Sequence, residues 1–61
     1  MIHLTAKNFA MEAKRYPGPV VVMFYAVWCG KCAMMKPVLE KLEQRYADRI
    51  RFCEVEIEES A

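Results

Sequence analysis

A chain of 61 residues has room for one small domain, and a monomer of this size buries only about 60% of the surface that its unfolded form exposes. The hydrophobic content of 56% is typical of a globular protein, and the net charge of +1 with dispersed basic residues argues against a nucleic-acid-binding surface. The apolar stretch 20–29 is too short to cross a membrane as a helix, and residues 1–9 lack the pattern of a secretory signal. We therefore expect a cytoplasmic protein without a membrane partner.

The first part of the chain predicts a short strand followed by a helix. Residues 1–4 are mostly apolar and suit a strand. From Thr5 the apolar residues recur at helical spacing, and either Thr5 or Asn8 could cap this helix. The helix is expected to end at the segment 16–19, because the residue before a proline disfavours helical geometry.

Two further strands and a longer helix complete the pattern. The apolar, β-branched run Val20–Tyr25 is typical of a strand covered on both faces. A helical pattern follows Cys32 and contains Pro37, where a kink is expected. Residues 51–58 alternate and predict a strand with Cys53, Val55 and Ile57 on one face. The order strand, helix, strand, helix, strand implies an α/β fold with right-handed crossovers and parallel strands.

Cys29 and Cys32 are the candidate catalytic residues. Side chains three residues apart at the start of a helix lie about 5–6 Å from each other, which suits a disulfide. The N–H groups and the positive dipole end of the helix favour a thiolate at Cys29, and the positive charge of Lys31 acts in the same direction. Position makes Cys29 the candidate nucleophile and Cys32 the resolving thiol that attacks the mixed disulfide.

A structural zinc site is the alternative interpretation of this cysteine pair. Zinc usually takes four ligands, and only Cys53 and His3 could bring the number to four within one chain. Cys53 falls on the apolar face of its predicted strand, where a thiol is usually a small buried hydrophobe. We therefore expect thiol redox chemistry and no metal or other cofactor.

The segment from Phe24 to Cys32 resembles the active-site strand and loop of the thioredoxin family. Pro37 matches the proline that kinks the active-site helix of that family, and residues 2–5 and 55–57 resemble two of its strands. The resemblance implies a disulfide-containing protein substrate and an electron-donor reductase as partners. It also implies that Trp28, Gly30 and Lys31 contact the substrate.

Three departures from the family pattern are visible. Lys31 stands where the family usually has proline, which changes the expected redox poise toward a more oxidising disulfide. Met23 stands where the family has a buried carboxylate, and Glu54 takes the position of its lysine partner. We interpret Glu54 as an exposed strand residue, and we expect resolution by Cys32 to be slow.

The third departure is that the resemblance covers only the first part of the family fold. No proline follows Pro37 in these 61 residues, so we expect the cis-proline side of the substrate groove to be incomplete within them. Residues 1–61 are expected to form a thioredoxin-like domain lacking its C-terminal part, with a three-stranded parallel sheet in the order first, third, second and two helices. Its strand Val20–Tyr25 would then be an apolar edge that favours a homodimer or another partner. The alternative function is a dimerising or docking module, with the cysteine pair idle or holding a metal or iron–sulfur cluster across the dimer.

Overall fold

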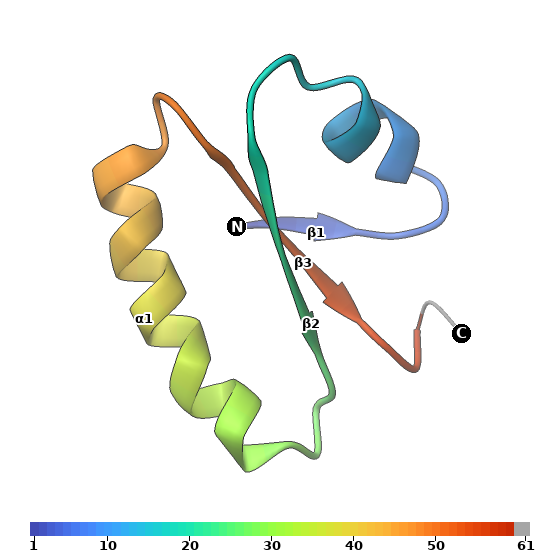
Figure 1. Ribbon diagram of the computed structural model, residues 1–61. Helices are drawn as coiled ribbons and strands as arrows, with labels where there is room; N and C mark the ends of the chain where they lie inside the picture. The colour runs from blue at the N-terminus through green and yellow to red at the C-terminus, as the bar shows by residue number, and fades with distance from the viewer. Residues whose placement is uncertain (60–61) are drawn as a thin grey trace.

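The structure is a computed structural model that describes residues 1–59. Its elements follow one another along the chain as strand β1, helix η1, strand β2, helix α1 and strand β3 (Figure 1). Their bounds are Ile2–Leu4, Ala10–Lys14, Val20–Tyr25, Gly30–Tyr46 and Arg51–Glu56, respectively. The three strands form one parallel sheet in the order β1-β3-β2. The predicted fold class, an α/β fold with this strand order and two helices, is confirmed.

The two helices lie on opposite sides of the sheet (Figure 1). Ala13 of η1 packs against the core cluster of Leu4, Cys53 and Val55, so these side chains face η1. The next residue along β3 from Cys53 is Glu54, which contacts Lys36 of α1 on the other face. The alternation of side chains along β3 therefore separates an apolar face from a face that carries carboxylates.

β3 is the most buried element because it lies between the other two strands. Phe52, Cys53, Glu54, Val55 and Glu56 are all buried, and Cys53 is fully inaccessible. β2 is the more hydrophobic strand in sequence, yet its residues are only half-buried or exposed. The predicted cover on both faces of Val20–Tyr25 is thus incomplete, because β2 is a terminal strand of the sheet formed by residues 1–59.

The N-terminal helix is shorter than its sequence pattern predicts. Residues Ala10–Lys14 form a single turn of π-helix, and no side chain caps its N-terminus. The expected cap by Thr5 or Asn8 is wrong, because both side chains stabilise the preceding turn instead. The Asn8 Oδ1 atom accepts a hydrogen bond from the Thr5 N–H at 2.7 Å, and the Thr5 hydroxyl accepts one from the Lys7 N–H at 3.2 Å.

One other boundary differs from expectation. β3 ends at Glu56, and residues 57–59 form a turn in which the N–H groups of Glu58 and Glu59 bond to the Glu56 carboxylate. That carboxylate therefore ends the strand two residues early. α1 continues through Pro37, and it carries no fully buried residue.

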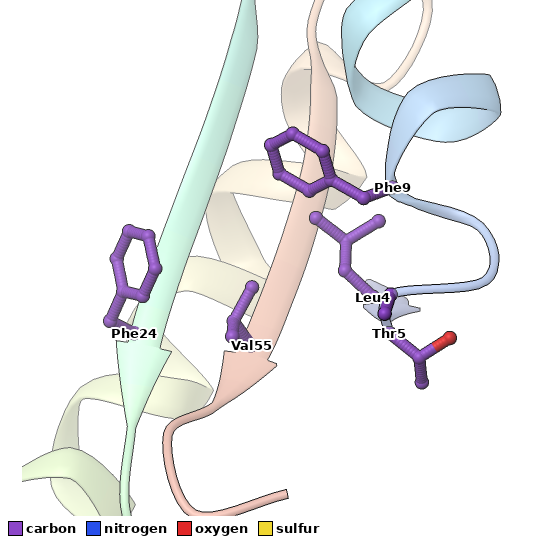
Figure 2. Close-up of a pocket in the computed structure, with 6 residues that line it drawn as sticks. Leu4, Thr5, Phe9, Phe24 and Val55 are labelled. Atoms are coloured by element: carbon purple, nitrogen blue, oxygen red, sulfur yellow. The ribbon is translucent and has the colours of Figure 1, made fainter. Parts of the chain in front are cut away.

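An open apolar cavity lies on the η1 face of the sheet. Figure 2 shows Phe24 and Val55 on neighbouring strands, opposite Leu4 and Phe9 of the N-terminal segment. The cavity has a volume of about 220 Å³, and the Phe24 side chain beside it is 67% exposed. The η1 face is therefore only partly covered at the end of the sheet where β2 finishes.

Candidate functional site

Cys29 occupies the N-cap position of α1. Its backbone is extended, with φ −94° and ψ 109°, and its N–H donates to the Ala26 carbonyl at 3.0 Å. Ala26 is buried directly after β2, so the turn 26–29 connects a fixed strand end to the start of the helix. The Cys29 Sγ atom accepts a hydrogen bond from the Cys32 backbone N–H at 3.4 Å. The sulfur thus satisfies one of the N–H groups that a helix start leaves without a partner.

These hydrogen bonds favour the thiolate form of Cys29. The pKa of the Cys29 thiol lies below its ordinary value, first because of a hydrogen bond from the Cys32 side chain and second because of the Cys32 backbone N–H. Desolvation opposes this lowering, and the Lys31 backbone N–H adds a contribution smaller than that of desolvation. The contribution of Lys31 is therefore its N–H rather than the side-chain charge predicted from sequence. A lowered pKa increases the fraction of reactive thiolate at neutral pH.

Cys29 and Cys32 both line one cavity between α1 and the end of β2, which we name the cysteine cavity. Its volume is about 200 Å³. Its lining residues are Met23, Tyr25, Ala26, Val27, Cys29, Cys32, Ala33 and Lys36. Cys29 and Cys32 are partly exposed free thiols, so a substrate sulfur can reach the pair from solvent.

The three predicted substrate-contacting residues surround the pair and are exposed. The Trp28 side chain is 70% exposed, and its indole N–H donates to the Glu58 carboxylate at 2.6 Å. Gly30 begins the helix, and a Cβ atom added there would meet no atom within 4 Å. Lys31 lines a neighbouring apolar groove together with Cys32 and Met35. All three residues therefore lie where a substrate approaching Cys29 could contact them.

Glu54 is buried, so its interpretation as an exposed strand residue is wrong. Only 8% of the residue is accessible, because β3 is the central strand and α1 covers this face. Its carboxylate bonds to His3 Nδ1 at 2.9 Å, accepts from the Tyr25 hydroxyl at 3.2 Å, and pairs with Lys36 Nζ at 3.2 Å. Three different elements thus supply the partners that compensate the burial of this charge.

The network shifts the pKa values of its members in opposite directions. Burial alone would raise the pKa of Glu54, but the hydrogen bonds from His3 and Lys36 outweigh it and hold this pKa below its ordinary value. The hydrogen bond to Glu54 in turn raises the pKa of Lys36 and that of His3, whose other ring nitrogen bonds to Glu59 at 2.7 Å. At neutral pH the network therefore contains a carboxylate and an ammonium.

Sequence reasoning missed the participation of Lys36 and Tyr25 in this network. One signal was available: Lys36 follows Cys32 by four residues, so both side chains lie on the same side of a helix. The tyrosine hydroxyl could not be placed without the register, which pairs Tyr25 with Glu56 and Met23 with Glu54. The partners of the Glu54 carboxylate come from β1, β2 and α1, so they depend on how these elements pack together.

Cys53 and His3, the two other residues of the alternative zinc site, lie apart from the cysteine pair. Cys53 is in the core cluster on the η1 face, and burial raises the pKa of its thiol. His3 uses both ring nitrogens in contacts with Glu54 and Glu59. Neither residue lines the cysteine cavity.

Comparison with known proteins places this site in a family. The family model described as Thioredoxin matches residues 1–61. The thioredoxin of Acidithiobacillus ferridurans is 35% identical over 60 residues, which cover 98% of this chain and 56% of that protein. The thioredoxin of Pseudomonas aeruginosa is 32% identical with the same coverage, and that of Alicyclobacillus acidocaldarius is 40% identical over 93% of this chain and 53% of its own length. The chain spans just over half the length of these relatives, and it belongs to the thioredoxin family.

Proposed function

We propose that this chain carries out thiol–disulfide exchange, with Cys29 as the attacking thiol and Cys32 as the resolving thiol. The observation that carries the proposal is the Cys29 sulfur at the N-cap of α1, where it accepts the Cys32 N–H beside a solvent-open cavity that Cys32 also lines. Membership of the thioredoxin family supports the same chemistry.

The reaction proceeds in two displacements. The Cys29 thiolate attacks one sulfur of a substrate disulfide, forms a mixed disulfide and expels the other substrate sulfur as a thiolate. Cys32 then loses its proton and attacks the Cys29 sulfur, so the Cys29–Cys32 bond forms as the bond from Cys29 to the substrate breaks. The substrate gains two electrons and two protons, and the pair is left oxidised. We expect Trp28, Gly30 and Lys31, which are exposed around the partly exposed Cys29, to contact the substrate.

The partners belong to the proposal as well. A protein disulfide is the oxidant, and a reductase returns the pair to the dithiol form, as the family resemblance implies. A reducing compartment such as the cytoplasm suits this cycle. We propose further that residues 1–61 correspond to the N-terminal part of a thioredoxin-like domain. In relatives of nearly twice this length, further chain accompanies the matched region.

The test is reduction of insulin disulfides by dithiothreitol in the presence of the protein. The wild-type chain is expected to accelerate the reaction, and Cys29→Ser is expected to abolish the acceleration. Cys53→Ala, which removes a thiol from the opposite face, serves as the control and should retain the acceleration once circular dichroism shows that it is folded. Full acceleration by Cys29→Ser would contradict the proposal. So would metal bound to the fresh protein with thiols that react only after chelation.

We also propose that a second copy of the chain pairs with the outer edge of β2. The support is that β2 is a terminal strand of the sheet of residues 1–59, and that its side chains are apolar and only partly buried. Sedimentation of the wild-type protein should then show a dimer, and Phe24→Lys should shift it toward the monomer because it places a charge on that strand. A wild-type protein that remains monomeric over a wide concentration range would refute the dimer.

A further inference from the structure

Lys36 is the charged side chain that shares the cysteine cavity with Cys32. The two residues lie one helical turn apart on α1, and both line this cavity, whose volume is about 200 Å³. Met23 and Tyr25 supply the β2 side of the same cavity. Cys32 therefore has an ammonium-bearing residue as its neighbour toward the sheet.

Glu54 holds this ammonium in place. The Lys36 Nζ atom lies 3.2 Å from Glu54 Oε1 and 5.7 Å from the centre of the Tyr25 ring. Glu54 itself is fixed from two other strands, by the His3 ring and by the Tyr25 hydroxyl. The Lys36 side chain is 43% exposed, and its contact with Glu54 restrains it, which lowers the entropy lost when it interacts with a second anion.

Of the two charged groups, the Lys36 ammonium and the Glu54 carboxylate, only Lys36 belongs to a residue that lines the cysteine cavity. Lys36 lines the cysteine cavity, whereas Glu54 lies on β3 and is not one of its lining residues. The other groups near Lys36 are Tyr25 of β2 and Glu40 of α1, and His3 of β1 reaches it only through Glu54. Lys36 is protonated at neutral pH, as an ordinary lysine is, and the hydrogen bond to Glu54 raises its pKa further. It is therefore a fixed cation rather than a base.

We propose that the Lys36 ammonium stabilises the Cys32 thiolate in the second displacement, and that Glu54 is a positioning residue for this ammonium. The proposal deepens the exchange function proposed above and depends on it. In this step the Cys32 thiol gives its proton to solvent, and the thiolate attacks the Cys29 sulfur of the mixed disulfide. The Cys29–Cys32 bond forms, the bond to the substrate sulfur breaks, and that sulfur leaves as a thiolate. Lys36 forms no bond and transfers no proton.

The electrostatic reason is general. A positive charge close to a thiol favours the ionised form and lowers its pKa. The effect is larger in a partly enclosed cavity than in bulk water, because the effective dielectric constant is lower there. Met23 supplies no charge on the β2 side of the cysteine cavity, so Lys36 is the only permanently charged side chain among the lining residues.

The experiment separates the two displacements with Ellman's disulfide as the probe. Attack by Cys29 releases a first thionitrobenzoate, and attack by Cys32 on the mixed disulfide releases a second. Both releases are followed by stopped-flow absorbance over a range of pH. Lys36→Met should slow the second release about tenfold at neutral pH and move its pH midpoint upward, while the first release changes little.

Three further variants complete the test. Lys36→Gln should reproduce the pH shift, and Lys36→Arg should restore the midpoint because the charge returns. Lys41→Met, on an exposed position of α1, is the matched control and should behave as wild type. An unchanged midpoint in both neutral variants would overturn the role of Lys36, and so would a shift seen with Met but not with Gln. If the wild type shows no second release, or if Cys32→Ser retains it, the exchange function itself fails.

Discussion

β2 and β3 lie side by side in one sheet, yet the more hydrophobic of the two strands is the less buried one. β2 reads Val-Val-Val-Met-Phe-Tyr, and its side chains are half-buried or exposed. β3 contains Arg51, Glu54 and Glu56, and five of its six residues are buried. The difference arises from position in the sheet, because β3 has a neighbour on both sides and β2 on one side in the described chain. The hydrophobicity of a strand's sequence therefore does not by itself predict how deeply that strand is buried.

The buried strand can hold carboxylates because each has partners. Glu54 bonds to three side chains, and Glu56 accepts two backbone N–H groups from the turn that follows the strand. In the described part of the chain no buried side-chain nitrogen or oxygen lacks a hydrogen-bond partner. Glu54 therefore connects the sheet to α1, and Glu56 connects β3 to the turn that follows it.

The largest change in unfolding free energy is expected for Phe52→Ala, with Phe24→Ala as its comparison. Phe52 of β3 is 4% exposed and Phe24 of β2 is 67% exposed. Phe52→Ala should cost about 3–5 kcal/mol of unfolding free energy, enough to unfold a domain of this size, whereas Phe24→Ala should change it by less than about 0.5 kcal/mol. Urea unfolding followed by circular dichroism measures both. Equal losses would show that β2 is as well covered as β3.

A smaller effect, about 1–3 kcal/mol, is expected for Glu54→Gln, because the variant loses the charge that pairs with Lys36 and leaves a buried amide with poorer partners. The pKa of Glu54 is lowered in the folded state, so its charge stabilises the fold above its unfolded pKa. That contribution disappears as the pH falls through the folded pKa. The wild type should therefore lose stability in acid more steeply than Glu54→Gln. Parallel acid profiles of the melting temperature would exclude this role.

The smallest effect is expected for His3→Gln, at the exposed end of the same network. The hydrogen bonds to Glu54 and Glu59 raise the pKa of His3, so its contribution is fully present below its unfolded pKa of 6.5 and is lost as the pH rises through the folded pKa. The His3 side chain is 40% exposed, and solvent screening limits the contribution to a few tenths of a kcal/mol. Melting temperatures of wild type and variant should converge at alkaline pH. A constant difference from neutral to alkaline pH would contradict the charge argument.

The sequence predicts those parts of the molecule that depend on near neighbours in the chain. The position of Cys29 at a helix start requires only residues 26–33, and the structure shows the corresponding cap. The alternation of β3 correctly separates Cys53 and Val55 from Phe52, Glu54 and Glu56.

No helix among residues 1–59 is long and apolar enough to span a membrane.

One misprediction from the sequence depends on contacts between distant segments. Glu54 has the residue type of an exposed position, and its burial follows from strand order and from α1 above it. The predicted cap of the N-terminal helix is wrong for a local reason, because the side chains of Asn8 and Thr5 bond within the turn before that helix. Side chains that suit a helix cap also suit such a turn, and the pattern alone does not separate the two.

The contact between Trp28 and Glu58 has a practical consequence. The chain contains one tryptophan, and it directly precedes Cys29. Its indole is held by the turn that follows β3, at 2.6 Å from the Glu58 carboxylate. All the tryptophan emission of this protein therefore originates beside the reactive sulfur and from a ring tied to the far end of the described chain. Disulfide closure and release of that turn can be followed as changes in one optical signal, without attaching a dye.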